Sequence, residues 1–100
     1  MYPLEIQKAL FTAKIAEITS LAKSLGMEDS PTLNKLSDLE KLFENKTINS
    51  VTTQGKIVRI RAMAVGYLMA KNSERDVMFQ KTSEAVTIAE IVMMEFIRQK

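Results

Sequence analysis

The densest group of chemically active side chains in this sequence is a set of cations between positions 56 and 75, namely Lys56, Arg59, Arg61, Lys71 and Arg75. Cations that share one face of a domain bind nucleic-acid phosphates by releasing counterions. On a helix, however, Arg59 and Arg61 would point about 160° apart, and Glu74 and Asp76 would neutralise the far end of the set. A solvated basic rim is therefore the first interpretation, and a nucleic-acid site made of these five cations is the alternative.

The sequence contains few residues of the types that usually carry out catalysis. The chain contains neither His nor Cys, which are the commonest general base and the commonest ligands of transition metals. The nearest carboxylate pairs, such as Glu40 and Glu44, fall at helix ends or on polar faces, where they usually cap or solubilise. The sequence therefore predicts a protein that is not an enzyme, with no catalytic, metal or cofactor site.

Composition indicates one ordinary globular domain covering residues 1–100. Apolar residues make up 46% of the chain and charged residues 26%, and the net charge is only +2. The most apolar stretch, residues 62–70, is much shorter than the roughly 20 residues of a membrane span. The first residues lack the basic patch and apolar run of a secretory signal. We therefore expect a cytoplasmic, intracellular protein of cellular or viral origin.

The first half of the chain has the periodicity of two helices. Leu4, Phe11, Ile18 and Leu25 recur every seven residues, and Gly26 follows them as a helix-ending residue, which predicts a helix over 3–25. Ser30-Pro31 has the residue types of a helix start, and leucines at helical spacing follow, which predicts a second helix over 31–44. The short connection predicts an antiparallel helical hairpin.

Residues 47–61 allow two interpretations. Their β-branched residues, with Gln54-Gly55 between them, fit a short β-hairpin. Their apolar pattern nevertheless continues at helical spacing as far as Leu68, which favours a helix starting near Thr52 or Thr53 and ending near Ala70. Polar residues 72–76 then favour a break over one continuous rod, followed by a last helix over about 74–98. The predicted fold is an all-α four-helix bundle.

The second half of the chain carries more apolar surface than a bundle core requires. In the third helix, Ala62, Gly66 and Ala70 form a stripe of small residues, and Met69 belongs to a second apolar sector with Val58 and Val65. In the last helix, Ile91 and Met94 lie outside the arc that would face the core. These features favour an interface with another chain. The alternative for the third helix is that it is the central helix of a monomeric bundle, and the alternative for Ile91 and Met94 is that they are isolated exposed hydrophobic residues.

We therefore expect a non-enzymatic protein–protein interaction or assembly module that associates with itself or with a protein partner. It would act as an adaptor, an inhibitor or a structural component of a larger or viral assembly. Its predicted interface consists of Ala62, Gly66, Met69, Ala70, Ile91 and Met94. The alternative is a small nucleic-acid-binding regulator that uses the basic 56–75 segment.

Overall fold

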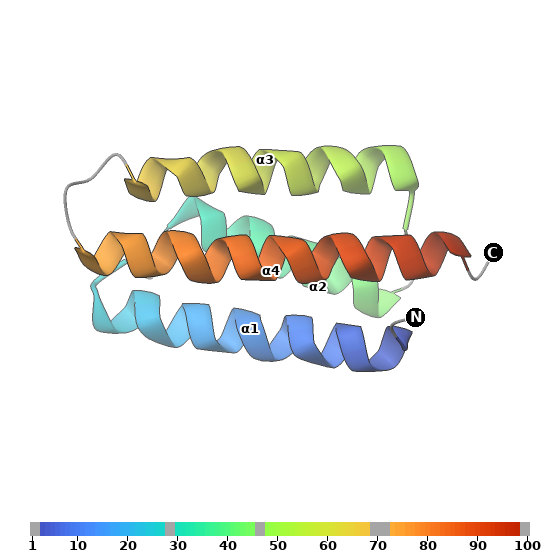
Figure 1. The fold of residues 1–100 in the computed structure, drawn as a ribbon, viewed down its shortest axis with the longest axis horizontal. Helices are drawn as coiled ribbons and strands as arrows, with labels where there is room; N and C mark the ends of the chain where they lie inside the picture. The colour runs from blue at the N-terminus through green and yellow to red at the C-terminus, as the bar shows by residue number, and fades with distance from the viewer. Residues whose placement is uncertain (1–2, 28–29, 46–47, 69–72, 99–100) are drawn as a thin grey trace.

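The computed structural model describes residues 3–27, 30–45, 48–68 and 73–98. These parts of the chain form the helices α1 (Leu4–Ser24), α2 (Pro31–Asn45), α3 (Ser50–Leu68) and α4 (Ser73–Arg98). Each helix runs antiparallel to the one before it, and α4 lies beside both α1 and α3 (Figure 1). The bundle measures 44 × 22 × 22 Å. The predicted all-α four-helix arrangement is confirmed, and no helix of the described residues is long and apolar enough to cross a membrane.

The first helix ends as its sequence predicts. Gly26 has a φ of 70°, in the left-handed region that side chains other than glycine rarely adopt. The Met27 N–H donates to the Ala22 carbonyl at 2.7 Å, and the Gly26 N–H donates to the Lys23 carbonyl at 3.2 Å. These two bonds form a Schellman motif, which satisfies carbonyls that the helix leaves unpaired. The chain can therefore turn back into α2 within a few residues.

The β-hairpin alternative over residues 47–61 is wrong, because α3 is continuous from Ser50. Asn49 caps this helix: its side-chain oxygen accepts hydrogen bonds from the Val51 and Thr52 N–H groups, at 3.0 and 3.1 Å. The helix therefore starts before the predicted Thr52 or Thr53. Burial at helical spacing, which includes Ile57 and Ile60, overrides the β preference of the branched residues.

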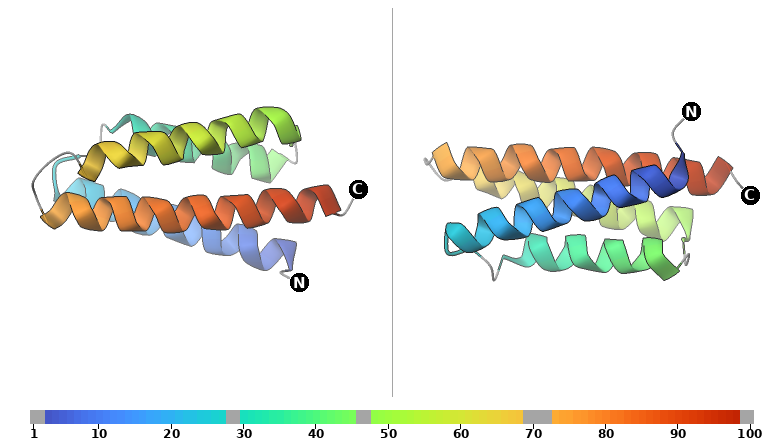
Figure 2. Two further views of the ribbon diagram at one scale, coloured as in Figure 1. Left: turned by 45° about the horizontal axis from the view of Figure 1, so that its top comes forward. Right: turned by 90° about the horizontal axis from the view of Figure 1, so that it is seen from below.

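The predicted break between the last two helices is present. Because α3 ends at Leu68 and α4 packs antiparallel beside it, the two are separate helices and not one rod (Figure 2). The end of α3 near Ala70 that the sequence predicts lies outside the described residues.

One core runs along the bundle and is centred on α4. It buries side chains of all four helices, among them Ile18, Leu36, Ile60 and Val92. Near the end that holds both termini, the Phe43 ring lies between two others, with centroid distances of 5.2 Å to Phe11 and 6.3 Å to Phe96. Aromatic pairs at these distances add to the stability that buried area provides. The core thus joins α1, α2 and α4 at this end.

A network of four charged side chains crosses the contact between α1 and α4. The Lys14 ammonium lies 2.7 Å from Glu84 and 3.2 Å from Glu17, and Lys81 lies 2.5 Å from Glu17. Hydrogen bonds from Lys81 and Lys14 lower the pKa of Glu17, and the hydrogen bond to Glu84 raises the pKa of Lys14. The network links the two antiparallel helices across their contact.

Two glycine substitutions should have opposite effects on stability. Gly26→Ala places a side chain at a positive φ and should destabilise the fold by about 1 kcal/mol or more. Gly55→Ala should stabilise it by about 0.5–1 kcal/mol, because Gly55 lies inside α3 and a Cβ there meets no heavy atom within 4 Å. Urea unfolding of both variants measures the difference, and equal effects would contradict the assigned backbone conformations.

The acid sensitivity of the fold should depend on Glu17. Because its pKa is lowered in the folded state, its ion pairs stabilise the protein above the unfolded pKa. That contribution is lost as the pH falls through the folded pKa. Between about pH 6 and pH 3, Glu17→Gln should therefore lose less free energy of unfolding than the wild type. Glu44→Gln, whose carboxylate has no ion pair with another described residue, is the control and should follow the wild type.

Candidate interaction surface on α3

The helix α3 is apolar on two opposite faces. Thr53, Ile57, Ile60 and Ala64 are buried on the inner face. On the opposite face, Val51, Val58 and Val65 are 81%, 54% and 47% exposed. Together with Gly55 and Ala62 they form a row with spacings of four and three residues, which we call the outer stripe. This spacing keeps a row of side chains on one side of a helix, as in coiled coils.

The outer stripe is made of small side chains. Ala62 is exposed, and the position of a Cβ on Gly55 is open space. A surface with so little side-chain bulk lets another backbone approach closely. The stripe is therefore shaped for contact with a regular element such as a helix.

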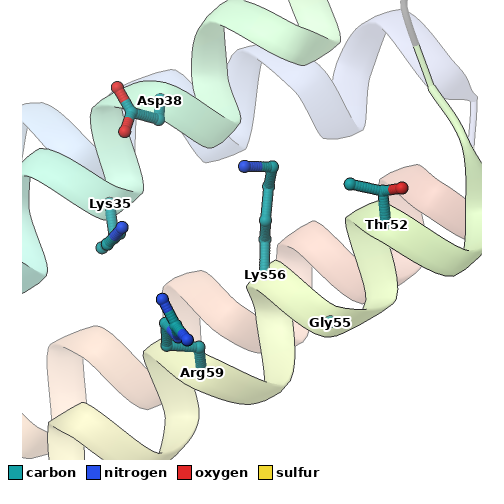
Figure 3. Close-up of a pocket in the computed structure, with 6 residues that line it drawn as sticks. All are labelled: Lys35, Asp38, Thr52, Gly55, Lys56 and Arg59. Atoms are coloured by element: carbon teal, nitrogen blue, oxygen red, sulfur yellow. The ribbon is translucent and has the colours of Figure 1, made fainter.

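A cationic pocket of about 280 Å³ borders the stripe between α2 and α3 (Figure 3). Its lining residues are Lys35 and Asp38 from α2 and Thr52, Gly55, Lys56 and Arg59 from α3. Lys56 extends from α3 towards α2, and the side chains of Lys35 and Arg59 also reach into the space between the helices. Among the described lining residues, three cations against one carboxylate give this flank an excess of positive charge, which suits an anionic group.

The other flank of the stripe is electrically balanced. Arg61 points towards α4 and forms an ion pair with Glu90, across the contact between the two helices. The positive charge beside the stripe is therefore concentrated on the side that faces α2.

A second apolar patch lies on α1 and α4. Ile6 and Leu10 are 56% and 48% exposed, Met94 is 57% exposed, and Ile91 is half-buried. The ion pairs of Lys14 with Glu84 and of Lys81 with Glu17 show how the antiparallel helices are aligned, with the N-terminal half of α1 beside the C-terminal half of α4 (Figure 1). We call Ile6, Leu10 and Ile91 the α1/α4 patch. Met94 is not a member, because it follows Glu90, the partner of Arg61, by one helical turn and so lies towards α3.

The predicted interface residues fall in different places. Ala62 lies on the outer stripe, Ile91 belongs to the α1/α4 patch, and Met94 is exposed on the side of α4 towards α3. Gly66 belongs to α3, but its surroundings are not described, and Met69 and Ala70 lie outside the described residues. The structure therefore does not bring the described members of the set together on one surface.

The predicted basic segment is also divided. Lys56 and Arg59 line the pocket, and Arg61 turns to the opposite flank. Lys71 lies outside the described residues, and Arg75 belongs to α4 with a side chain that is not described.

Sequence reasoning missed Lys35, Val51, Ile6 and Leu10. The seven-residue recurrence of Val51, Val58 and Val65 is visible in the sequence and could have identified the outer stripe. No local signal could have paired Lys35 with Lys56 and Arg59, because the pocket requires α2 and α3 to be side by side.

No protein-family model, curated protein or solved structure matches the chain. Among the described residues, no group of three or more carboxylates is placed to hold a metal ion. Any inference about function therefore rests on the exposed surface of the bundle.

The outer stripe should contribute little to folding, unlike equivalent residues in the core. Val92→Ala removes a fully buried side chain and should lower the free energy of unfolding by about 2 kcal/mol or more. Val58→Ala makes the same change at an exposed site and should alter it by no more than about 0.5 kcal/mol. Urea unfolding of the two variants gives both values, and a comparable loss in both would show that Val58 is a core residue.

Proposed function

We propose that this chain is a non-enzymatic, helical protein–protein interaction or assembly module. The observation that supports this proposal is the outer stripe, with Val51, Val58 and Val65 exposed on the face of α3 opposite its buried residues. Isolated exposed hydrophobic residues are ordinary, but a periodic row beside a charged pocket is typical of a binding surface. Such a module serves as an adaptor, an inhibitor or a structural component of a larger assembly, cellular or viral.

Self-association is the second part of the proposal, and we assign it to the α1/α4 patch. A two-fold axis places the same patch of two copies face to face, so the surface must be compatible with itself. The patch meets this requirement, because its members are apolar and the neighbouring charges of Glu17, Lys81 and Lys14 are already paired.

Nucleic-acid binding remains the alternative function. Lys35 favours it, because this α2 residue adds a third cation to Lys56 and Arg59. Against it, Arg61 is already paired with Glu90, and the adjoining stripe is apolar. Phosphate contacts would leave the valines of the stripe exposed. Protein binding accounts for both the apolar residues and the cations.

Light scattering behind a sizing column tests self-association. At high micromolar concentration the wild type should have at least twice the 11.3 kDa mass of one chain. Because Leu10→Lys puts a charge into the α1/α4 patch at an exposed position, this variant should shift the mass to that of a monomer. Val77→Lys, which places the same charge at an exposed valine near the start of α4, should keep the wild-type mass.

A wild-type monomer under these conditions would remove self-association from the proposal. A 20-base-pair DNA duplex added at about 50 mM salt should not change the mass. An increase that disappears as salt is added would favour the alternative function.

A further inference from the structure

We propose that the outer stripe and the cationic pocket form one docking site, and that its occupant is an acidic, amphipathic α-helix of another protein. This inference rests on the proposed interaction function and adds the chemistry of the partner. Three observations support it. The stripe and the pocket are continuous, the stripe has the length and the small residues that suit a helix, and the excess positive charge lies on one flank of the stripe.

The stripe and the pocket are parts of one surface. Gly55 belongs to both: it is a member of the stripe and it lines the pocket. Lys56 and Arg59 come from the same turns of α3 as Gly55 and Val58, on the side that faces α2. An element lying along the stripe therefore has the pocket directly at its side.

The dimensions of the stripe fit a helix. From Val51 to Val65 the helix axis advances by about 21 Å, or roughly four turns. A partner helix of about 15 residues covers this length, and apolar residues at spacings of three and four would meet the stripe. The absence of a side chain at Gly55 and the single methyl of Ala62 allow the two backbones to approach closely.

The charges determine the character of the partner helix. Between Ser50 and Leu68, α3 contains Lys56, Arg59 and Arg61 but no acidic residue. Glu90 neutralises Arg61, whereas Lys35 adds to the positive charge on the side that faces α2. Asp and Glu side chains along one flank of the partner would enter the pocket and form charge-assisted hydrogen bonds with these cations.

The same charges disfavour a second copy of α3 as the occupant. If two α3 helices crossed near Val58, the Lys56 and Arg59 of one copy would lie close to those of the other. Like charges at a contact cost several kcal/mol, and α3 has no acidic residue to offset them. The α3 surface therefore fits a different protein, whereas the α1/α4 patch suits self-association.

Three designed peptides test the proposal. Each is a capped 18-residue helix with Leu and Ala at spacings of three and four, and one flank carries Glu, Gln or Lys. At about 150 mM salt, fluorescence anisotropy should show the Glu peptide binding the full chain about tenfold more tightly than the Gln peptide. The Lys peptide should bind more weakly than both. Amide NMR shifts caused by the Glu peptide should map to α3 and the facing side of α2.

Two variants and two matched controls locate the site. Val58→Lys and Arg59→Glu should each weaken the Glu peptide about tenfold, because one interrupts the stripe and the other reverses a pocket charge. Val77→Lys and Lys23→Glu make the same changes at exposed positions of α4 and α1, and should leave the affinity within about twofold. Circular dichroism of all four variants should show the same helical content, since each altered side chain is exposed.

Each contrary result overturns a defined part of the proposal. Equal affinity for the three peptides, lost only in Val58→Lys, would overturn the acidic partner while supporting a helix-binding module. No binding of any peptide would overturn the docking site, and the scattering measurement would still decide self-association separately. Binding of a DNA duplex that is lost in Arg59→Glu but kept in Val58→Lys would overturn the helical partner in favour of nucleic acid.

Discussion

The surface chemistry of this bundle depends on a constraint that acts on α3: a helix packed at one corner of a four-helix bundle can bury only one of its faces. Ile57 and Ile60 take the inner positions, so Val51, Val58 and Val65 point away from the core. Rotating the helix to bury the valines would expose the two isoleucines, which have the larger apolar side chains. The outer stripe is therefore fixed by the packing that stabilises the fold.

The position of α4 limits how far α3 can rotate in the bundle. Because α4 packs against both α1 and α3, it holds two of its neighbours at once. Glu17 and Lys81 join it to α1, and Arg61 with Glu90 joins it to α3. These pairs are partly exposed, and exposed pairs add little to stability, so the buried side chains of α4 do most to set the rotation of its neighbours. The rotation of α3 determines that Arg61 is neutralised, whereas Lys56 and Arg59 face α2.

Much of the fold could be predicted from the sequence, because periodicity and helix-ending residues are local signals. The predicted helix over 31–44 agrees with α2, and Gly26 ends α1 in the left-handed conformation that glycine favours. The start of α3 was placed too late, since the capping role of Asn49 was overlooked among β-branched residues. The pocket could not be predicted, because Lys35 and Lys56 are brought together only when two helices pack.

The distribution of charge separates the two apolar surfaces by the partners they favour. Beside the α1/α4 patch, Lys14 and Lys81 pair with Glu17 and Glu84, so these four charges add no net repulsion to contact with an identical surface. Beside the outer stripe, the described residues that line the pocket include three cations, Lys35, Lys56 and Arg59, and one carboxylate, Asp38. Burial of apolar area favours association at either surface, but only complementary charge selects the partner. A small domain can thus use one surface to assemble with itself and keep the other for a different, acidic protein.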